Sequence, residues 1–175
     1  MSVCFRHRAF LTLACALSSV VLVGCASYRW TSDVPQKMRT VSVPTFRNES
    51  DVQGLGSAMA RQVLREFQRE GTFSIKTAGD AALEIQGIVK GASASSSGYD
   101  RHSGMRFASY DLTAVVEVSV IDKVNGRVLL DNREYTATTT FISGQDYSTA
   151  MRDSAGRLSD DLARQVVDDV LNLKW

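Results

Sequence analysis

The chain has 175 residues, of which 22% are charged and 44% are apolar, and its formal net charge is +1 at neutral pH. This length favours a single domain, and the apolar fraction excludes wholesale disorder. Because 20 basic residues balance 19 acidic ones, the composition disfavours a dedicated nucleic-acid binder, which normally carries a basic excess.

The N-terminus has the layout of a secretory signal peptide. Arg6 and Arg8 precede an uncharged apolar run over residues 9–23, and small residues lie near its end. The run is too short for a membrane-spanning helix, which needs about 20 apolar residues. We therefore expect residues 1–24 to be cleaved, and the loss of two arginines changes the formal net charge to −1.

The cleavage site carries the most specific motif. Leu22-Val23-Gly24-Cys25 resembles the bacterial lipobox. The resemblance implies that the Cys25 thiol receives a diacylglycerol, that a peptidase cleaves before it, and that the new N-terminus receives an N-acyl chain. Several acyl chains make a membrane anchor durable. In such lipoproteins Ala26, in place of Asp, favours the outer membrane. The alternative is an ordinary cysteine near a conventional cleavage site.

The mature chain divides into a tether and a domain. Residues 25–38 form the expected lipidated N-terminus and short tether, and residues 39–175 the single α+β domain. Tyr28 and Trp30 in the tether suit either the membrane interface or packing on the domain's own edge.

The domain begins with an expected strand over Arg39–Phe46, in which Pro44 suits a strand end or an edge. The apolar period then changes, which predicts an amphipathic helix over Val52–Glu70. Asp51 is a candidate cap for its start, and Gly71 is a natural stop. The apolar stripe of this helix consists of Leu55, Met59, Val63, Leu64 and Phe67.

Two strands and a loop are expected next. Thr72–Thr77 predicts a short strand, and Ala82–Gly91 predicts another because its apolar residues recur at even steps. Residues 92–98, ASASSSG, form a low-complexity stretch that predicts a flexible loop. This loop is expected to continue through Tyr99–Met105.

The strongest strand pattern covers Arg106–Asp122, where every second residue from Tyr110 to Val120 is apolar. Asn125-Gly126 then predicts a hairpin turn, and Arg127–Phe141 predicts the return strand. Both strands exceed the usual length of 3–10 residues. They form either a projecting ribbon that adds to another protein's sheet, or one bent and bulged sheet.

A closing helix is predicted over residues 146–174, where apolar residues recur at steps of three and four. The order strand, helix, several strands, helix predicts an α+β fold. We expect a mainly antiparallel four- to five-stranded sheet with two amphipathic helices packed on one face.

The mature chain offers few side chains for catalysis. His102 is its sole histidine, no nucleophile elbow accompanies it, and Cys25 carries lipid. One histidine cannot form a usual zinc site, and no phosphate-binding or dinucleotide-binding glycine motif is present. The acid pairs Asp160-Asp161 and Asp168-Asp169 suit the polar face of the closing helix. We therefore expect no enzyme activity, no metal and no cofactor, and a role in binding or assembly.

Several short segments, taken in order, are typical of one family. They are Tyr28-Arg29-Trp30, the stretch Met38–Asn48 with V-P-x-F-x-N, Phe73-Ser74-Ile75, the stretch Asp80–Gly87 with D-A-x-L-E-I-x-G, and Gly126–Leu129 followed by Tyr135. Together they resemble the lipopolysaccharide-assembly lipoprotein family (LptE-like) over nearly the whole mature chain. The two strand patterns also occur in other small periplasmic lipoproteins, including a family that activates penicillin-binding proteins.

The resemblance implies an outer-membrane partner, a lipopolysaccharide-transporting β-barrel. In that family the lipoprotein sits in the barrel lumen, supports barrel assembly and contacts lipopolysaccharide at the end of transport. Because lipopolysaccharide is anionic, such contacts would need basic side chains. The candidates are Arg101 and Arg106 in the long loop and Lys123 and Arg127 at the hairpin. Ordinary surface charge is the alternative for each.

A second function stays open, a periplasm-facing lipoprotein regulator of another envelope machine such as a peptidoglycan synthase. About a dozen residues separate Cys25 from the first expected strand, and such a length spans at most roughly 40 Å. This short tether favours work close to the membrane.

Overall fold

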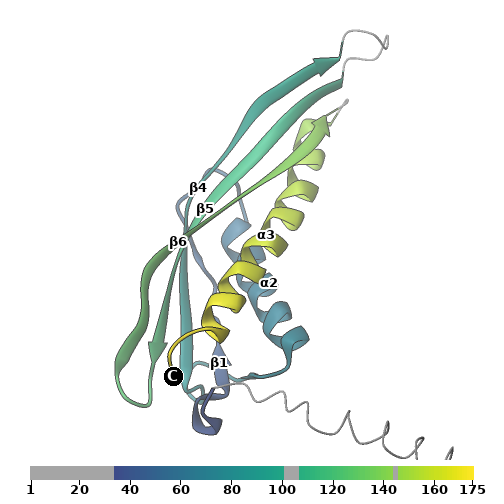
Figure 1. Cartoon of the computed structure of the whole chain (residues 1–175). Coiled ribbons are helices and arrows are strands. Elements are labelled where there is room, and N and C mark those ends of the chain that lie inside the picture. The colour runs from purple at the N-terminus through teal and green to yellow at the C-terminus, as the bar shows by residue number, and fades with distance from the viewer. Residues whose placement is uncertain (1–33, 101–106, 144–145) are drawn as a thin grey trace, which may run out of the picture. The chain divides into compact units, whose positions relative to one another are not determined.

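A computed structural model describes residues 34–100, 107–143 and 146–175 of the chain (Figure 1). Its elements follow the predicted order of strand, helix, several strands and helix. They are η1 (Gln36–Met38), β1 (Thr40–Ser42), β2 (Arg47–Asn48), α2 (Leu55–Glu70), β3 (Ser74–Ile75), β4 (Leu83–Asp100), β5 (Phe107–Asp122), β6 (Arg127–Ser143) and α3 (Tyr147–Leu171).

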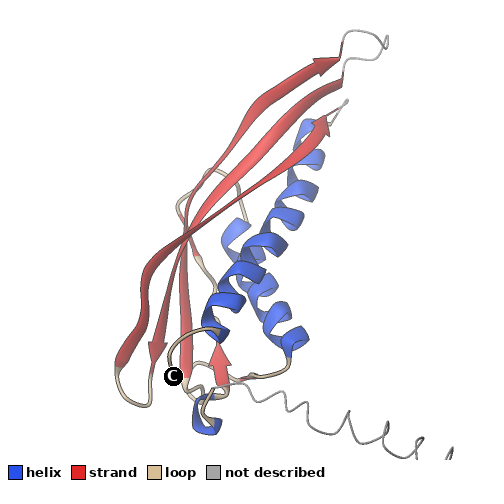
Figure 2. Cartoon of the chain, viewed as in Figure 1, coloured by secondary structure: helices blue, strands red, loops and turns tan. Residues whose placement is uncertain are grey.

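The strands form one sheet, and the two α-helices lie on the same side of it (Figure 2). The strand order is β3-β1-β4-β5-β6, and β2 also pairs with β4. The long strands β4, β5 and β6 are antiparallel neighbours, whereas β1, β2 and β3 add short parallel pairings. The predicted α+β fold is therefore confirmed. Within the described ranges the sheet has six strands rather than four to five, because the segment around Pro44 divides the first expected strand into β1 and β2.

The expected flexible loop over residues 92–98 is wrong. These residues belong to β4, where Ser93 pairs with Thr113 and Ser95 pairs with Asp111 across to β5. A composition of small residues indicates flexibility only when no partner strand is available. Here the backbone bonds to β5 hold the segment, and the methyl groups of Ala92 and Ala94 pack against the core on the helix side.

Two arrangements were open for the long hairpin of β5 and β6. The structure has the bent and bulged sheet, and the hairpin does not project as a two-stranded ribbon. β4 accompanies β5 along its whole length, and α3 packs against both β5 and β6. The pairing register shifts twice between β4 and β5 and twice between β5 and β6. Bulges of this kind bend a strand and increase its twist, which lets one sheet follow the helices.

The helices bury their apolar stripes against one face of the sheet. α2 ends at Gly71, which has the left-handed φ of 82° expected of a helix stop. The start differs from the expected cap at Asp51, because the helix begins after Gly54 and no side chain caps it. α3 begins at Asp146, whose carboxylate accepts a hydrogen bond from the Thr149 amide.

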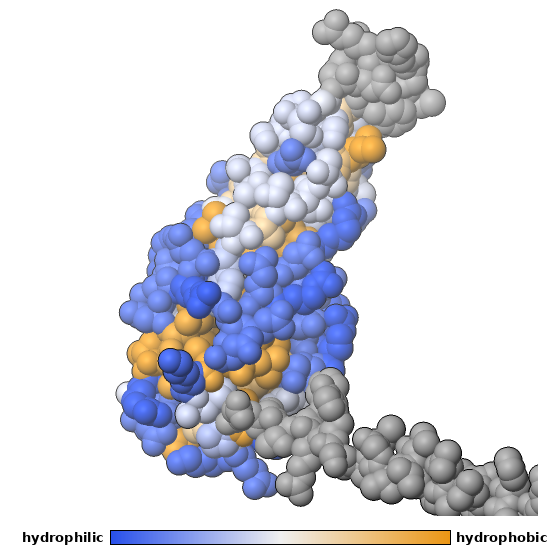
Figure 3. All heavy atoms as spheres, in the orientation of Figure 1, coloured by the Kyte–Doolittle hydropathy of each residue, from blue (hydrophilic) through white to orange (hydrophobic). Residues whose placement is uncertain are grey.

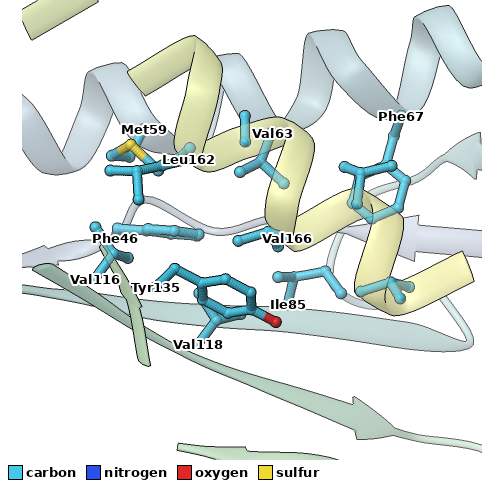
Figure 4. Close-up of a cluster of buried hydrophobic side chains, with 14 of the residues drawn as sticks. Phe46, Met59, Val63, Phe67, Ile85, Val116, Val118, Tyr135, Leu162 and Val166 are labelled. Carbon is cyan, nitrogen blue, oxygen red and sulfur yellow. The ribbon is translucent and has the colours of Figure 1, made fainter. Parts of the chain in front are cut away.

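The core between helices and sheet is continuous and apolar (Figure 4). Every helix-facing residue of β5 from Leu112 to Val120 is at most 1% exposed. Phe67 of α2 and Leu162 of α3 are fully buried above them. Val34 and Met38 are also buried, so packing already begins within the segment that the sequence assigns to the tether.

Candidate functional site

Of the four predicted basic contacts, the described structure contains Lys123 and Arg127. The Lys123 ammonium donates to the carbonyl oxygen of Ala78 (2.6 Å) and to the Glu84 carboxylate (3.1 Å). The Arg127 guanidinium lies 3.3 Å from the Asp122 carboxylate. Both cations therefore have acidic partners within the chain. Arg101 and Arg106 lie outside the described residues.

The lipidation motif, Leu22, Val23, Gly24 and Cys25, also lies outside the described residues, as do Tyr28 and Trp30. Its assignment stays a prediction from the sequence. None of the helices in the described part of the chain is long and apolar enough to cross a membrane.

Asp122 organises the hairpin end of the sheet. Its carboxylate accepts hydrogen bonds from the amides of Val124 and Asn125 and from the Asn125 side chain. Burial by itself would raise the pKa of Asp122, but the hydrogen bonds from Asn125, Arg127 and Val124 outweigh it and lower the pKa. The predicted Asn-Gly turn is confirmed, since Gly126 has a left-handed φ of 65°.

The acid pairs of α3 do more than cover a polar face. Asp160 accepts a hydrogen bond from Gln62 of α2. Asp169 accepts a hydrogen bond from the Tyr135 hydroxyl at 2.9 Å and forms an ion pair with Arg133 at 3.0 Å. Tyr135 and Arg133 both lie on β6. These contacts join α3 to its neighbours. In the described residues no group of three or more His, Cys, Asp or Glu is arranged to hold a metal ion.

Among the described residues, both α-helices lie on one side of β4, β5 and β6, and we call the other, partly exposed side the open face. Its central residues on β5 are all partly exposed, in contrast to the buried residues that alternate with them. In the orientation of Figure 3, many residues over the upper part of the domain are pale, which marks intermediate hydropathy. Across β4, β5 and β6 the rows of the open face are Glu84, Ile121 and Val128; Gln86, Ser119 and Asn132; Ile88, Glu117 and Glu134; Gly91, Val115 and Thr136; Ser93, Thr113 and Thr138; Ser95, Asp111 and Thr140.

A groove of about 440 Å³ lies on the open face. It is bounded by the three rows that begin with Glu84, Gln86 and Ile88 and by the segment that joins β1 to β2. Gln86 donates to Glu84 at 2.8 Å on its floor, and this bond together with the contact from Lys123 lowers the pKa of Glu84. The groove is lined by Pro44, Thr45, Arg47, Glu84, Gln86, Gly87, Ile88, Glu117, Ser119 and Asn132.

Phe46 connects this region to the core. Its ring lies against the helix-facing side of Gly87, where a Cβ would overlap it. A Cβ on Gly56 of α2 would likewise overlap the Phe46 carbonyl oxygen. Phe46 belongs to the V-P-x-F-x-N pattern, and Gly87 closes the D-A-x-L-E-I-x-G pattern. The two patterns therefore meet in space, and each supplies one half of a ring-on-glycine contact.

Comparison with known proteins identifies the family. The family model LptE, described as lipopolysaccharide-assembly, matches residues 38–172. The chain belongs to the LptE family. The comparison with curated proteins finds no match.

Solved structures resemble this chain at low identity. A Helicobacter pylori protein named as a neuraminyllactose-binding hemagglutinin homologue is 7% identical, with a TM-score of 0.51, and the match covers 82% of this chain and 89% of that one. A minor lipoprotein from Acinetobacter baumannii is 13% identical, with a TM-score of 0.45 and coverage of 77% and 93%. At such identities the likeness concerns the fold alone.

Proposed function

We propose that this LptE-family chain is an outer-membrane lipoprotein of the lipopolysaccharide transport and assembly machinery, where it partners and plugs a β-barrel. The family match over residues 38–172 carries the proposal, because it spans nearly all of the described domain. Diacylglycerol and an N-acyl chain on Cys25 would anchor the protein on the periplasmic side of the membrane, with the domain there or within the barrel lumen.

The domain has properties that a lumen plug requires. One continuous core makes it a rigid body, and the open face carries polar side chains that suit the polar interior of a large barrel. The role is binding and assembly rather than catalysis. In keeping with this, the α3 acids Asp160 and Asp169 are engaged by Gln62, Tyr135 and Arg133.

The tether supports work close to the membrane. Since Val34 is already buried in the domain, eight residues, 26–33, connect Cys25 to the core. Eight extended residues span at most roughly 29 Å. A regulator that reaches across the periplasm to a peptidoglycan synthase would need a longer linker.

The test is purification of the full-length lipidated protein from outer membranes, followed by depletion of the protein in cells. We expect a large β-barrel to co-purify, and depletion to leave that barrel misassembled and lipopolysaccharide stalled in the periplasm. A Cys25→Ser variant, which cannot be lipidated, should lose the outer-membrane location. Normal surface lipopolysaccharide after depletion, or recovery of a peptidoglycan synthase instead of a barrel, would overturn the proposal.

A further inference from the structure

The open face has an unusual charge distribution. Across β4, β5 and β6 its six rows contain four acids, Asp111, Glu84, Glu117 and Glu134. The nearby cations are Arg47, which pairs with Ile88 in the register, and Lys90 at the β4 bulge, and both are bound to Glu49. Two of the four acids have partners within the chain, because Lys123 neutralises Glu84 and the Thr140 hydroxyl donates to Asp111 at 2.6 Å.

The remaining two acids face one another. Glu117 of β5 and Glu134 of β6 are directly paired in the register of the sheet. No cation of the described residues forms an ion pair with either carboxylate. Like charges directly opposite on neighbouring strands destabilise a sheet. Within the described part of the chain, no ion pair offsets this local cost.

The groove lies beside this pair. Glu117 lines this recess of about 440 Å³ together with Glu84, whose carboxylate is bound by Lys123. Arg47 also lines the groove, and its guanidinium is bound to Glu49 at 2.7 Å. Of the charged residues that line the groove, Glu117 is the one without an ion pair to a described residue, so an inserted lysine or arginine side chain would find its partner there.

The rest of the open face suits an extended polar contact. Thr136, Thr138 and Thr140 of β6 are exposed in one line, and the hydroxyls of Thr138 and Thr113 lie 2.8 Å apart. Side chains of this kind can both donate and accept hydrogen bonds. An anionic ligand gains nothing here, since it would meet the unpaired carboxylates.

We infer that the open face is the surface that docks a protein partner, with a basic side chain of the partner seated against the pair Glu117 and Glu134. This inference rests on the proposed function, in which the partner is the barrel and the docked surface is its polar lumen wall. It assigns the acidic half of the open face to protein contact and not to lipopolysaccharide.

The test measures binding of the full-length lipidated protein to the purified barrel from the same bacterium, in detergent and over a range of salt. The double reversal Glu117→Lys with Glu134→Lys should weaken binding at least tenfold and reduce its salt dependence. The matched control Asp153→Lys with Asp168→Lys makes the same charge change at exposed positions of α3 and should bind within threefold of wild type.

A milder variant separates docking from folding. Glu134→Gln removes the repulsion with Glu117, so it should raise the Tm of the isolated protein and still weaken barrel binding. A gain in Tm with unchanged affinity would overturn the inference.

The remaining outcomes are also decisive. If wild type binds the barrel and the double reversal binds equally well, the inference fails and the proposed function stands. If wild type does not bind the barrel, the proposed function fails and the inference fails with it. If the double charge reversal instead dissociates a dimer of this chain, a second copy of the chain is what binds the open face. The assignment of that face to the barrel is then overturned.

Discussion

The two faces of β5 follow different rules. On the helix side, Leu112, Ala114, Val116, Val118 and Val120 are at most 1% exposed, and each is apolar. On the open face the alternate residues are partly exposed and include two acids, two hydroxyls and two β-branched apolar residues. Packing decides each residue on the first face. On the open face, the stability of the fold depends little on which residue occupies each position. We therefore expect the residue types on that face to reflect what the surface contacts.

The largest contrast should come from two neighbouring residues of β5. Leu112→Ala creates a cavity under the helices and should lower the free energy of unfolding by about 2–5 kcal/mol. Thr113→Ala, one residue further and on the open face, should change it by about 0.5 kcal/mol or less. Urea unfolding of the two variants measures the difference. Similar losses for both would show that something covers the open face.

The ring-on-glycine contact tests how tightly the covered face is packed. Gly87→Ala places a methyl group against the Phe46 ring and should destabilise the domain by about 1–3 kcal/mol. In the Phe46→Leu background the same change should cost less, because the smaller side chain makes room. A double-mutant cycle of urea midpoints gives the coupling, and strict additivity would contradict the contact.

Loss of the hydrogen bond between Tyr135 of β6 and Asp169 of α3 should have a smaller effect. Tyr135→Phe removes the hydroxyl that donates to Asp169 and should cost about 1–2 kcal/mol, while Arg133 still pairs with the carboxylate. Burial, followed by the contact with Asp169, raises the pKa of Tyr135. The hydroxyl should therefore stay protonated in a spectroscopic titration up to pH 11, whereas an exposed tyrosine would ionise near pH 10.

The smallest effect is expected at the start of α3. Hydrogen bonds from the Thr149 hydroxyl and amide and from Ser148 lower the pKa of Asp146 to about 2. A carboxylate with a lowered pKa stabilises the fold above its unfolded pKa of about 3.9, and the contribution disappears as the pH falls through 2. Asp146→Ala should thus lower Tm by a constant amount above about pH 4, and the gap to wild type should close towards pH 2.

Asp146→Asn serves as the control for that titration. Asn caps helices about as well as Asp and does not ionise. Its Tm should exceed that of Asp146→Ala at every pH, and the difference should not close in acid. Parallel curves for wild type and Asp146→Ala down to pH 2 would contradict the role of Asp146 as a charged cap.

Periodicity predicts most of this fold and little of the candidate site. The apolar alternation of β5 and the stripes of α2 and α3 are visible in the sequence because burial selects those residues. The strand over residues 92–98 is not visible, since it depends on pairing with β5 rather than on its own side chains. The same holds for the parallel pairings of β1, which join residues 34 positions apart in the pairing with β3 and 42 positions apart in the pairing with β4.

The acid pair illustrates why a surface escapes sequence reasoning. Uninterrupted pairing from Asp122 and Arg127 would place Glu117 opposite Asn132. Two bulges on β6 shift the register by two residues and bring Glu134 there instead. The second bulge includes Asn132, which has a left-handed φ of 42° and exchanges hydrogen bonds with Ser119. Such bulges carry no periodic signal.

Together, these two bulges also determine which side chains of β6 face the helices and which face outward. Each inserts one extra residue, and one alone would turn the distal half of β6 over and drive its threonines against α3. Two insertions restore the phase, so Val128 before them and Thr136 after them face the same way. Relatives of this chain should therefore tolerate length changes in this stretch of the hairpin in steps of two residues. A single deletion there should be lost by selection even though it removes no core side chain.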